Sequence, residues 1–242
     1  MIRLAVLAGA VLAMAGCAEL TRWDPEAPSG PTAAAAGIYV VQRGDTLYKI
    51  AFMHRLDWRE LAAWNRLTDA HRIYPGQRLR LSPQGGPPAQ VGSAPPPRQT
   101  PSPTGRPAPP VTMPTRAGPP PQWRWPVNGP LVSRFGESRR NPTGIGIGGT
   151  DGREIHAAAD GEVVYSGSGL IGYGQLIILK HNDSYLSAYG FNQALRVTEG
   201  ERVESGQVIA LMGRGPADRP LLHFEIRVDG KPVDPARFLP SR

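Results

Sequence analysis

Hydrophobic and polar positions follow two different patterns in two separate parts of the chain. In residues 38–82, apolar residues at strand spacing open and close the segment, at 39–41 and 78–81. Two apolar stripes at helical spacing lie between them, and Asp45 and Asp57 stand where helix N-caps are expected. The pattern predicts a small βααβ module.

The pattern beyond residue 125 is of another kind. Short runs rich in β-branched residues, such as 161–165 and 175–179, are separated by glycines at close spacing, which is typical of strands joined by turns. Residues 221–227 form a further predicted strand, in which every second side chain points to the same face. The fold class predicted for residues 125–242 is therefore mainly β.

A proline-rich stretch between the two patterned segments cannot form a core. Sixteen of the 27 prolines fall in residues 83–126, and such a chain forms an extended spacer of about 3.1 Å per residue. Residues 18–37 are small, polar and rich in proline and alanine, which predicts a flexible leash. We expect a multidomain chain with a signal peptide at 1–16, a leash at 17–37, the first module at 38–82, a linker at 83–124 and the second module at 125–242.

The N-terminus predicts export and lipid attachment. The apolar run 4–15 is shorter than the roughly 20 residues of a membrane-spanning helix and suits the core of a signal peptide. It ends in Met-Ala-Gly-Cys at 14–17, which resembles the bacterial lipobox, and Cys17 is the only cysteine of the chain. The resemblance implies a lipid anchor on Cys17, and Ala18 after it implies the periplasmic face of the outer membrane. An ordinary secretory signal containing a cysteine is the alternative.

The distribution of charge indicates a polyanionic partner. The formal charge is +7, and residues 38–82 carry eight basic and four acidic side chains, whereas 126–242 balance thirteen against thirteen. A basic module suits cell wall, phospholipid or nucleic acid. Because the N-terminal signal directs the chain to the envelope, we expect the cell wall as partner and no nucleic acid.

The first module resembles the LysM family over its full length. The matching motifs are Tyr-x-Val-x-x-Gly-Asp-Thr-Leu-x-x-Ile-Ala from residue 39, Leu-x-x-x-Asn-x-Leu from 61 and Ile-x-x-Gly-Gln-x-Leu from 73. LysM modules bind N-acetylglucosamine-containing glycans between two loops, so the resemblance implies peptidoglycan binding. The residues of those loops in this chain are Gly44, Asp45, Thr46, Leu47, Ile73, Tyr74 and Pro75. The alternative for Leu47 and Ile73 is a role in the core alone.

The second module resembles the lysostaphin/LytM-type zinc endopeptidases across residues 125–242, on motifs such as Leu-His-Phe-Glu-Ile-Arg at 222–227. Active members use His-x-Gly-x-Asp for two zinc ligands, Tyr-x-His for a catalytic histidine and His-x-His for the third ligand. The positions that have lost these groups are Pro142, Gly146, Phe191 and Leu221. Only His223 remains of the three ligands. Since a catalytic zinc needs three protein ligands, we expect no metal, no other cofactor and no hydrolysis. His181, at a position where the family has a non-ligand histidine, is expected to be structural.

These losses resemble those of the NlpD/EnvC murein hydrolase activators, and a lipobox with one LysM module and a proline-rich spacer matches the NlpD type. The resemblance implies that the chain binds an N-acetylmuramoyl-L-alanine amidase and activates it during daughter-cell separation. A purely structural tether between envelope and peptidoglycan is the alternative, and a zinc-dependent endopeptidase is a third, less favoured one.

The vacated metal groove is the expected docking site for the amidase. Phe191 and Leu221 would provide apolar area there, and the alternation of residues 221–227 places a cation, Arg227, on the same face as His223. The groove residues expected to contact the partner are Thr143, Tyr189, Phe191, His223 and Arg227. A salt bridge of Arg227 within its own sheet is the alternative to partner contact.

Overall fold

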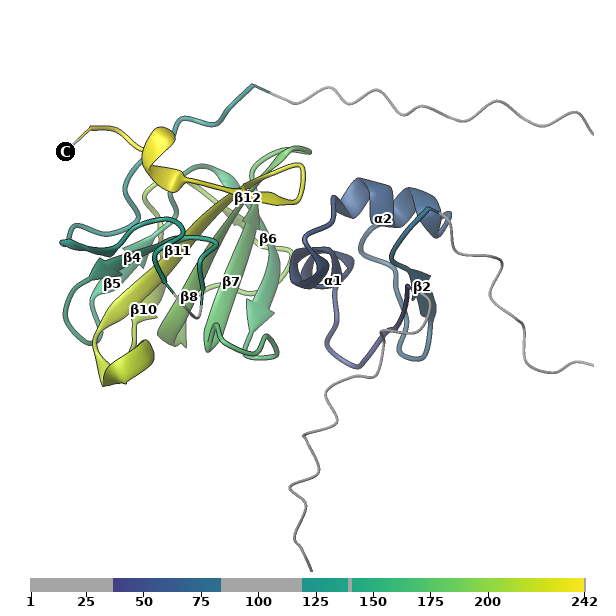
Figure 1. Ribbon diagram of the computed structural model, residues 1–242, viewed down its shortest axis with the longest axis horizontal. Coiled ribbons are helices and arrows are strands. Elements are labelled where there is room, and N and C mark those ends of the chain that lie inside the picture. The colour runs from purple at the N-terminus through teal and green to yellow at the C-terminus, as the bar shows by residue number, and fades with distance from the viewer. Residues whose placement is uncertain (1–36, 84–118, 139–140, 242) are drawn as a thin grey trace, which may run out of the picture. The chain divides into compact units, whose positions relative to one another are not determined.

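The computed structural model describes residues 37–83, 119–138 and 141–241 (Figure 1), and all of these belong to one compact unit. The predicted signal peptide 1–16 and Cys17 lie outside the described residues, as do nearly all of the leash and most of the linker. None of the helices in the described ranges is long and apolar enough to cross a membrane.

The first module has the predicted βααβ order. Its elements are β1 (Ile38–Val40), α1 (Leu47–His54), α2 (Trp58–Trp64) and β2 (Arg78–Arg80). Strands β1 and β2 pair antiparallel, and the two helices lie between them in sequence. The apolar stripes meet in a small core in which Leu47, Ile50, Leu61 and Leu79 are fully buried.

One of the two predicted helix caps is displaced by one residue. The N-cap of α1 is Thr46, whose hydroxyl accepts a hydrogen bond from Lys49 N at 3.0 Å, and not Asp45. Because Asp45 lies one residue further from the first helical turn, its carboxylate accepts from Gln42 N instead and closes the preceding turn. The cap of α2 is Asp57, as predicted.

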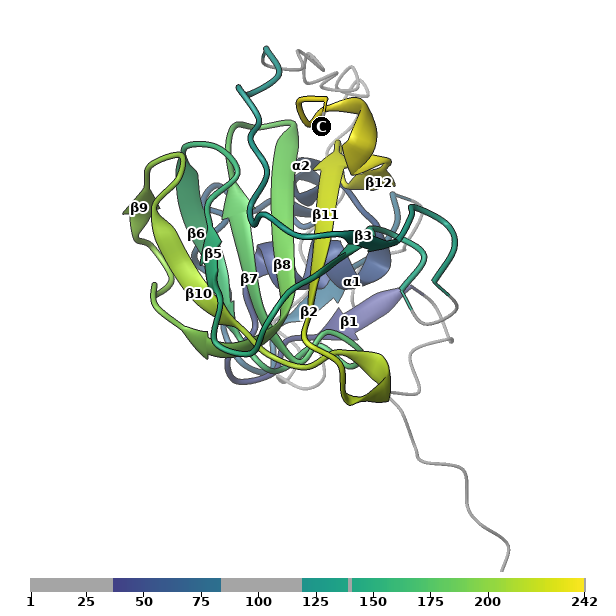
Figure 2. The same ribbon diagram turned by 90° about the vertical axis from the view of Figure 1, so that its left-hand side faces the viewer.

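The second module is one large antiparallel sheet. Within the described residues, its strands follow the order β3-β4-β11-β8-β7-β6-β9, of which β11, β8, β7, β6 and β9 can be followed in Figure 2. Strand β10 pairs with β5 and β8, and β12 pairs with β11. The strands are β3 (Leu131–Ser133), β4 (Ile145–Gly148), β5 (Glu154–His156), β6 (Gly161–Gly167), β7 (Gln175–Lys180), β8 (Tyr185–Leu195), β9 (Arg202–Val203), β10 (Val208–Met212), β11 (Leu221–Val228) and β12 (Lys231–Val233), with short 3-10 helices η1 (Pro216–Asp218) and η2 (Pro235–Arg237).

Alternation along β11 sorts its side chains between two faces of this sheet. Leu222, Phe224 and Ile226 are fully buried in the main core of the module. The residues between them lie on the opposite face, as predicted, and there Glu225 contacts both His223 and Arg227. The central strand β11 therefore presents a polar row on the face that carries the former metal position.

Candidate functional site

A buried carboxylate organises the polar end of this face. Glu225 is fully buried on β11, and its Oε1 accepts hydrogen bonds from Thr143 Oγ1 at 2.5 Å and from Tyr173 OH at 2.8 Å. His223 Nε2 lies 2.9 Å from the same oxygen. The other oxygen, Oε2, accepts from Arg227 Nε at 3.0 Å and Nη2 at 2.9 Å. The one histidine left at the metal position is thus bound to a neighbour in its own strand.

The charges of this cluster are balanced internally. Burial by itself opposes ionisation of Glu225, but the positive charge of Arg227, with hydrogen bonds from His223 and Thr143, lowers its pKa to about 2. Burial, reinforced by the charge of Glu225, raises the pKa of Tyr173 to about 12. At neutral pH the cluster therefore holds a carboxylate, a guanidinium and a protonated phenol.

One hydroxyl and two apolar side chains fill the other end of the former metal position. A Cβ placed on Gly146, where active enzymes carry aspartate, would collide with Ser133 Oγ and lie 3.2 Å from Leu221 Cδ1 and 3.3 Å from Val132 Cγ2. Those side chains occupy the space that an aspartate ligand would need. Val132 itself is 56% exposed on the edge strand β3.

Phe191, at the position of a catalytic histidine, has an uncommon backbone conformation. Its φ is +63° in the middle of β8, a region that non-glycine residues seldom adopt. Hydrogen bonds from Phe191 N to Tyr173 O and from Gly213 N to Phe191 O hold the segment in place. The ring lies 6.0 Å from that of His223, centroid to centroid. Backbone strain of this kind costs about 1–3 kcal/mol and is concentrated at functional sites.

The donor set at this position does not fit a catalytic zinc. His223 supplies one imidazole, which already contacts Glu225, while Pro142 and Gly146, at the other two ligand positions, have no side chain that can bind a metal. Among the described residues, no group of three or more His, Cys, Asp and Glu side chains is placed to hold a metal ion.

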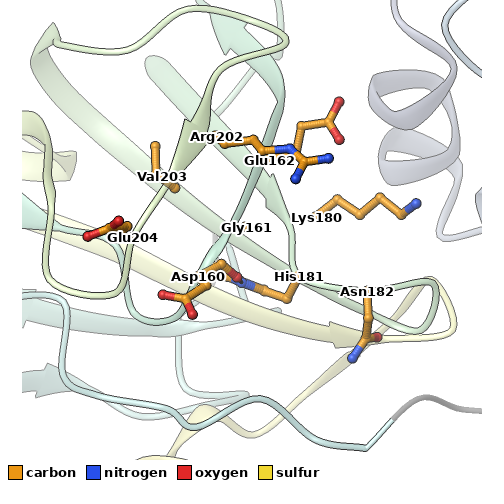
Figure 3. A pocket seen from close by; sticks show the side chains of 9 residues that line it. All are labelled: Asp160, Gly161, Glu162, Lys180, His181, Asn182, Arg202, Val203 and Glu204. Carbon is orange, nitrogen blue, oxygen red and sulfur yellow. Dashed lines mark hydrogen bonds between the residues drawn. The ribbon is translucent and has the colours of Figure 1, made fainter.

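His181 occupies a different part of the sheet. It lies in the pocket of Figure 3, which is formed at the ends of β6, β7 and β9. Its Nδ1 is 2.6 Å from Asp160 O and its Nε2 is 2.7 Å from Ser187 Oγ, and burial lowers its pKa to about 4. Both ring nitrogens are engaged within the module, so the contacts are those of a structural residue.

Four of the five predicted groove residues lie on the former metal face, but Tyr189 does not. Thr143, His223 and Arg227 surround Glu225, and Phe191 is next to them. Tyr189 is fully buried in the main core, opposite Phe224 in the register, and its hydroxyl accepts from Ala158 N. The prediction for Tyr189 is wrong because of the strand register. Gly190 pairs with His223 and lies on its face of the sheet, so the preceding residue, Tyr189, points to the opposite face.

Arg227 makes the contact that the sequence offered as the alternative to partner binding, a salt bridge within its own sheet. It forms the salt bridge within its own strand, with Glu225, and it also lies under another element, since Nη1 donates to Phe52 O of α1 at 2.6 Å. Only 2% of Arg227 is exposed. It is therefore not directly available to a partner in this arrangement.

The two loops predicted to bind glycan flank the β1–β2 pair of the first module. The second loop is tied to the end of β1 by a hydrogen bond from Gly76 N to Val41 O at 2.8 Å. Leu47 is fully buried in the LysM core and Ile73 packs against that core, whereas Tyr74 is 62% exposed. Gly44 and Pro75 are exposed and Thr46 is partly exposed, whereas the Asp45 side chain is only 1% exposed and is paired with Lys49.

Family comparisons agree with this division into modules. The LysM domain model matches residues 39–82, and the model of peptidase family M23 matches residues 140–235. The fold and the site thus define a LysM protein whose second domain has the M23 fold with an altered metal position.

Sequence comparison with individual proteins identifies the family more closely. The chain is 41% identical over 236 residues to a lipoprotein NlpD/LppB homolog of Pseudomonas aeruginosa, covering 87% of this chain and 80% of that one. It is 37% identical to the murein hydrolase activator NlpD of Salmonella typhimurium (84% and 68% covered) and 34% identical to the uncharacterized lipoprotein YgeR of Escherichia coli (96% and 90%). The chain belongs to the NlpD family of LysM and M23-domain lipoproteins.

Proposed function

We propose that this protein binds peptidoglycan through its LysM domain and activates an N-acetylmuramoyl-L-alanine amidase through the former metal face of its M23 domain, without cleaving peptidoglycan itself. The observation that carries the proposal is the filled metal position, at which Gly146, Leu221 and Phe191 replace ligand and catalytic groups. The name murein hydrolase activator, given to the Salmonella relative, supports the same role.

The exposed apolar area beside this position suits a protein partner. Val132 and Leu131 are 56% and 38% exposed on the edge strand, and Leu221 and Phe191 are partly exposed next to them. An amphipathic helix can bury its apolar face against an apolar surface of this kind, and a few large side chains then supply most of the affinity. The strained backbone of Phe191 points to a functional purpose for its ring, namely partner contact.

The LysM domain and the lipid anchor would place this surface at the wall. Of the predicted glycan contacts, the accessible ones are Gly44, Thr46, Tyr74 and Pro75. The side chains of Asp45 and Leu47 are buried, which favours a structural role for both. We further propose that Cys17 anchors the protein to the outer membrane, on its periplasmic face. Cys17→Ser should release the protein from the membrane fraction, and unchanged fractionation would contradict the anchor.

The central experiment measures amidase activity on labelled peptidoglycan sacculi with and without the purified chain. The chain alone should release no label and should contain no stoichiometric zinc, whereas amidase with the chain should release label faster than amidase alone. Release by the chain alone would indicate a peptidase. No effect on the amidase, together with intact peptidoglycan binding, would favour the structural tether.

Two substitutions at one position separate recognition from stability. Phe191→Asp should abolish stimulation because it places a charge in the apolar contact. Phe191→Gly should also weaken stimulation, by about 30-fold for a contact of about 2 kcal/mol, while unfolding no more easily than the parent because glycine adopts φ of +63° without strain. Full stimulation by the glycine variant would exclude the ring from the partner contact.

A further inference from the structure

The face that carries the former metal position continues as an apolar surface across the neighbouring strands. Glu225 is paired with Ala188 of β8, and Ala188 in turn with Ile178 of β7. Directly paired residues point to the same side of a sheet. Ala188 and Ile178 therefore share a face with the polar row of β11, and both are fully buried although they lie outside the main core.

The first helix of the LysM domain covers this apolar surface. Tyr48 and Phe52 of α1 are each only 2% exposed, and neither belongs to the LysM core. They pack into a separate cluster with residues of β6, β7 and β8 and the loop after β6, namely Val164, Tyr165, Leu170, Leu176, Ile178, Leu186 and Ala188. Two large aromatic side chains of α1 are thus buried by the M23 domain and not by their own.

Charged contacts align the helix with the polar row. The Arg227 guanidinium lies 3.3 Å from the centroid of the Phe52 ring, in addition to its hydrogen bond with the Phe52 carbonyl. At the start of α2, Arg59 Nη2 is 2.6 Å from Asp229 Oδ1, just beyond the end of β11. Lys180 Nζ lies 4.7 Å from the centroid of the Trp58 ring.

A chain of ring contacts connects α1 to the former metal position itself. The Phe52 ring is 5.6 Å from that of Tyr173, and the Tyr173 ring is 5.6 Å from that of His223. Tyr173 also donates to Glu225. One aromatic side chain therefore separates the LysM helix from the last remaining histidine of the site.

We infer that α1 acts as an intramolecular cap, which occupies the Arg227 half of the amidase-docking face and must leave before a partner can use the whole of it. This inference rests on the proposed function and adds its regulation. A partner that binds only the uncapped protein shifts the equilibrium between the capped and uncapped states toward the uncapped one. Its apparent affinity is the intrinsic affinity multiplied by the fraction of protein that is uncapped. Weakening the cap should therefore strengthen stimulation of the amidase, and locking it should abolish stimulation.

The unlocking variant is Phe52→Asp, which places a charge in the buried cluster without touching the LysM core. The matched control is Met53→Asp, the same change at the next residue of α1, which is 37% exposed. We expect Phe52→Asp to lower the concentration of chain that gives half-maximal stimulation by about tenfold, and Met53→Asp to leave it unchanged. Should Phe52→Asp prove unfolded by circular dichroism, Asp229→Arg replaces it, since that change lies outside all three cores.

The locking variant is Arg59→Lys, treated with a carbodiimide to join the introduced amine to the Asp229 carboxylate. Peptide mapping of the amide that links positions 59 and 229 reports the capped state without any amidase, and the parent with Arg59 gives the treatment control. We expect the joined protein to lose stimulation and Phe52→Asp to suppress the joining.

The outcomes distinguish the two proposals. Failure of the parent and of every variant to stimulate would overturn the proposed function and this inference with it. Stimulation that is equal in parent, joined and Phe52→Asp proteins would overturn the cap alone, as would failure to find the joined peptide.

Discussion

The two ends of the former metal face differ from the zinc-binding pattern of active enzymes in different ways. At one end Gly146 stands at a ligand position, and the side chains of Ser133, Leu221 and Val132 occupy the space beside it. Val132 and Leu221 are at least partly open to solvent. At the other, His223 is retained and bound to a carboxylate that a buried arginine neutralises. The stability of the first end depends on side-chain packing, and that of the second end depends on hydrogen bonds and charge balance.

This difference shows that the removal of a metal site leaves two separate problems. An empty ligand position leaves a void, which loses contacts until side chains fill it. A retained ligand leaves a buried polar group without its metal, and such a group is costly unless it finds another partner. Here Leu221 and Val132 fill the space beside the empty ligand position, and Glu225 provides the partner for the retained His223.

Arg227→Leu should have the largest effect, because it leaves the Glu225 carboxylate buried and unpaired. We expect a loss of about 3–5 kcal/mol in the free energy of unfolding, measured by denaturant titration. Leu221→Ala at the apolar end, a partly exposed site, should cost about 1 kcal/mol.

The double variant Glu225→Leu/Arg227→Leu gives the control for this prediction. It removes both charges at once and should recover at least half of the stability lost by Arg227→Leu. A double variant as unstable as the single one would mean that Arg227 acts through its contact with α1 and not through charge balance.

The polar end should respond to acid, and the apolar end should not. The pKa of Glu225 is about 2 in the folded protein against 4.5 for the free group, so its contribution is fully present above about pH 4.5 and is lost as the pH falls toward 2. The expected loss is on the order of 3 kcal/mol. In Glu225→Gln the fall in unfolding free energy across this window should be smaller by that amount.

His181 provides an internal comparison at higher pH. Its pKa of about 4 lies below the ordinary 6.5, so the unfolded chain takes up a proton between these values that the folded chain does not. Stability should therefore fall as the pH decreases from 6.5 to 4, equally in the parent and in Glu225→Gln. An altered slope in that upper range would show that the two groups are coupled.

Gly146→Ala should cost about 1–3 kcal/mol in the free energy of unfolding, since it overpacks the apolar end. Ser133→Ala removes the hydroxyl that the new methyl group would meet, and the double variant should regain most of the loss. Thermal unfolding of the parent, both single variants and the double variant tests this. No cost for Gly146→Ala would mean that the position is still open.

The LysM domain was largely determined by its local sequence. Both helices and the closing strand follow from apolar spacing and from Asp57, because each element is short and its core lies within residues 39–81. The exception is the N-cap of α1, which was predicted at Asp45 and is Thr46 in the structure. Both side chains carry an oxygen that can cap a helix, and the three-dimensional geometry decides which one does.

For the M23 domain, the sequence determined which groups were lost and which residues alternate along β11, since both are properties of a single segment. The tertiary structure decided the rest. Glu225 accepts hydrogen bonds from Thr143 and Tyr173, which are distant in the sequence. The strand register places Tyr189 in the core, and the M23 domain buries Phe52. Such pairings depend on how strands and domains meet in space, which the spacing of residues within one segment does not specify.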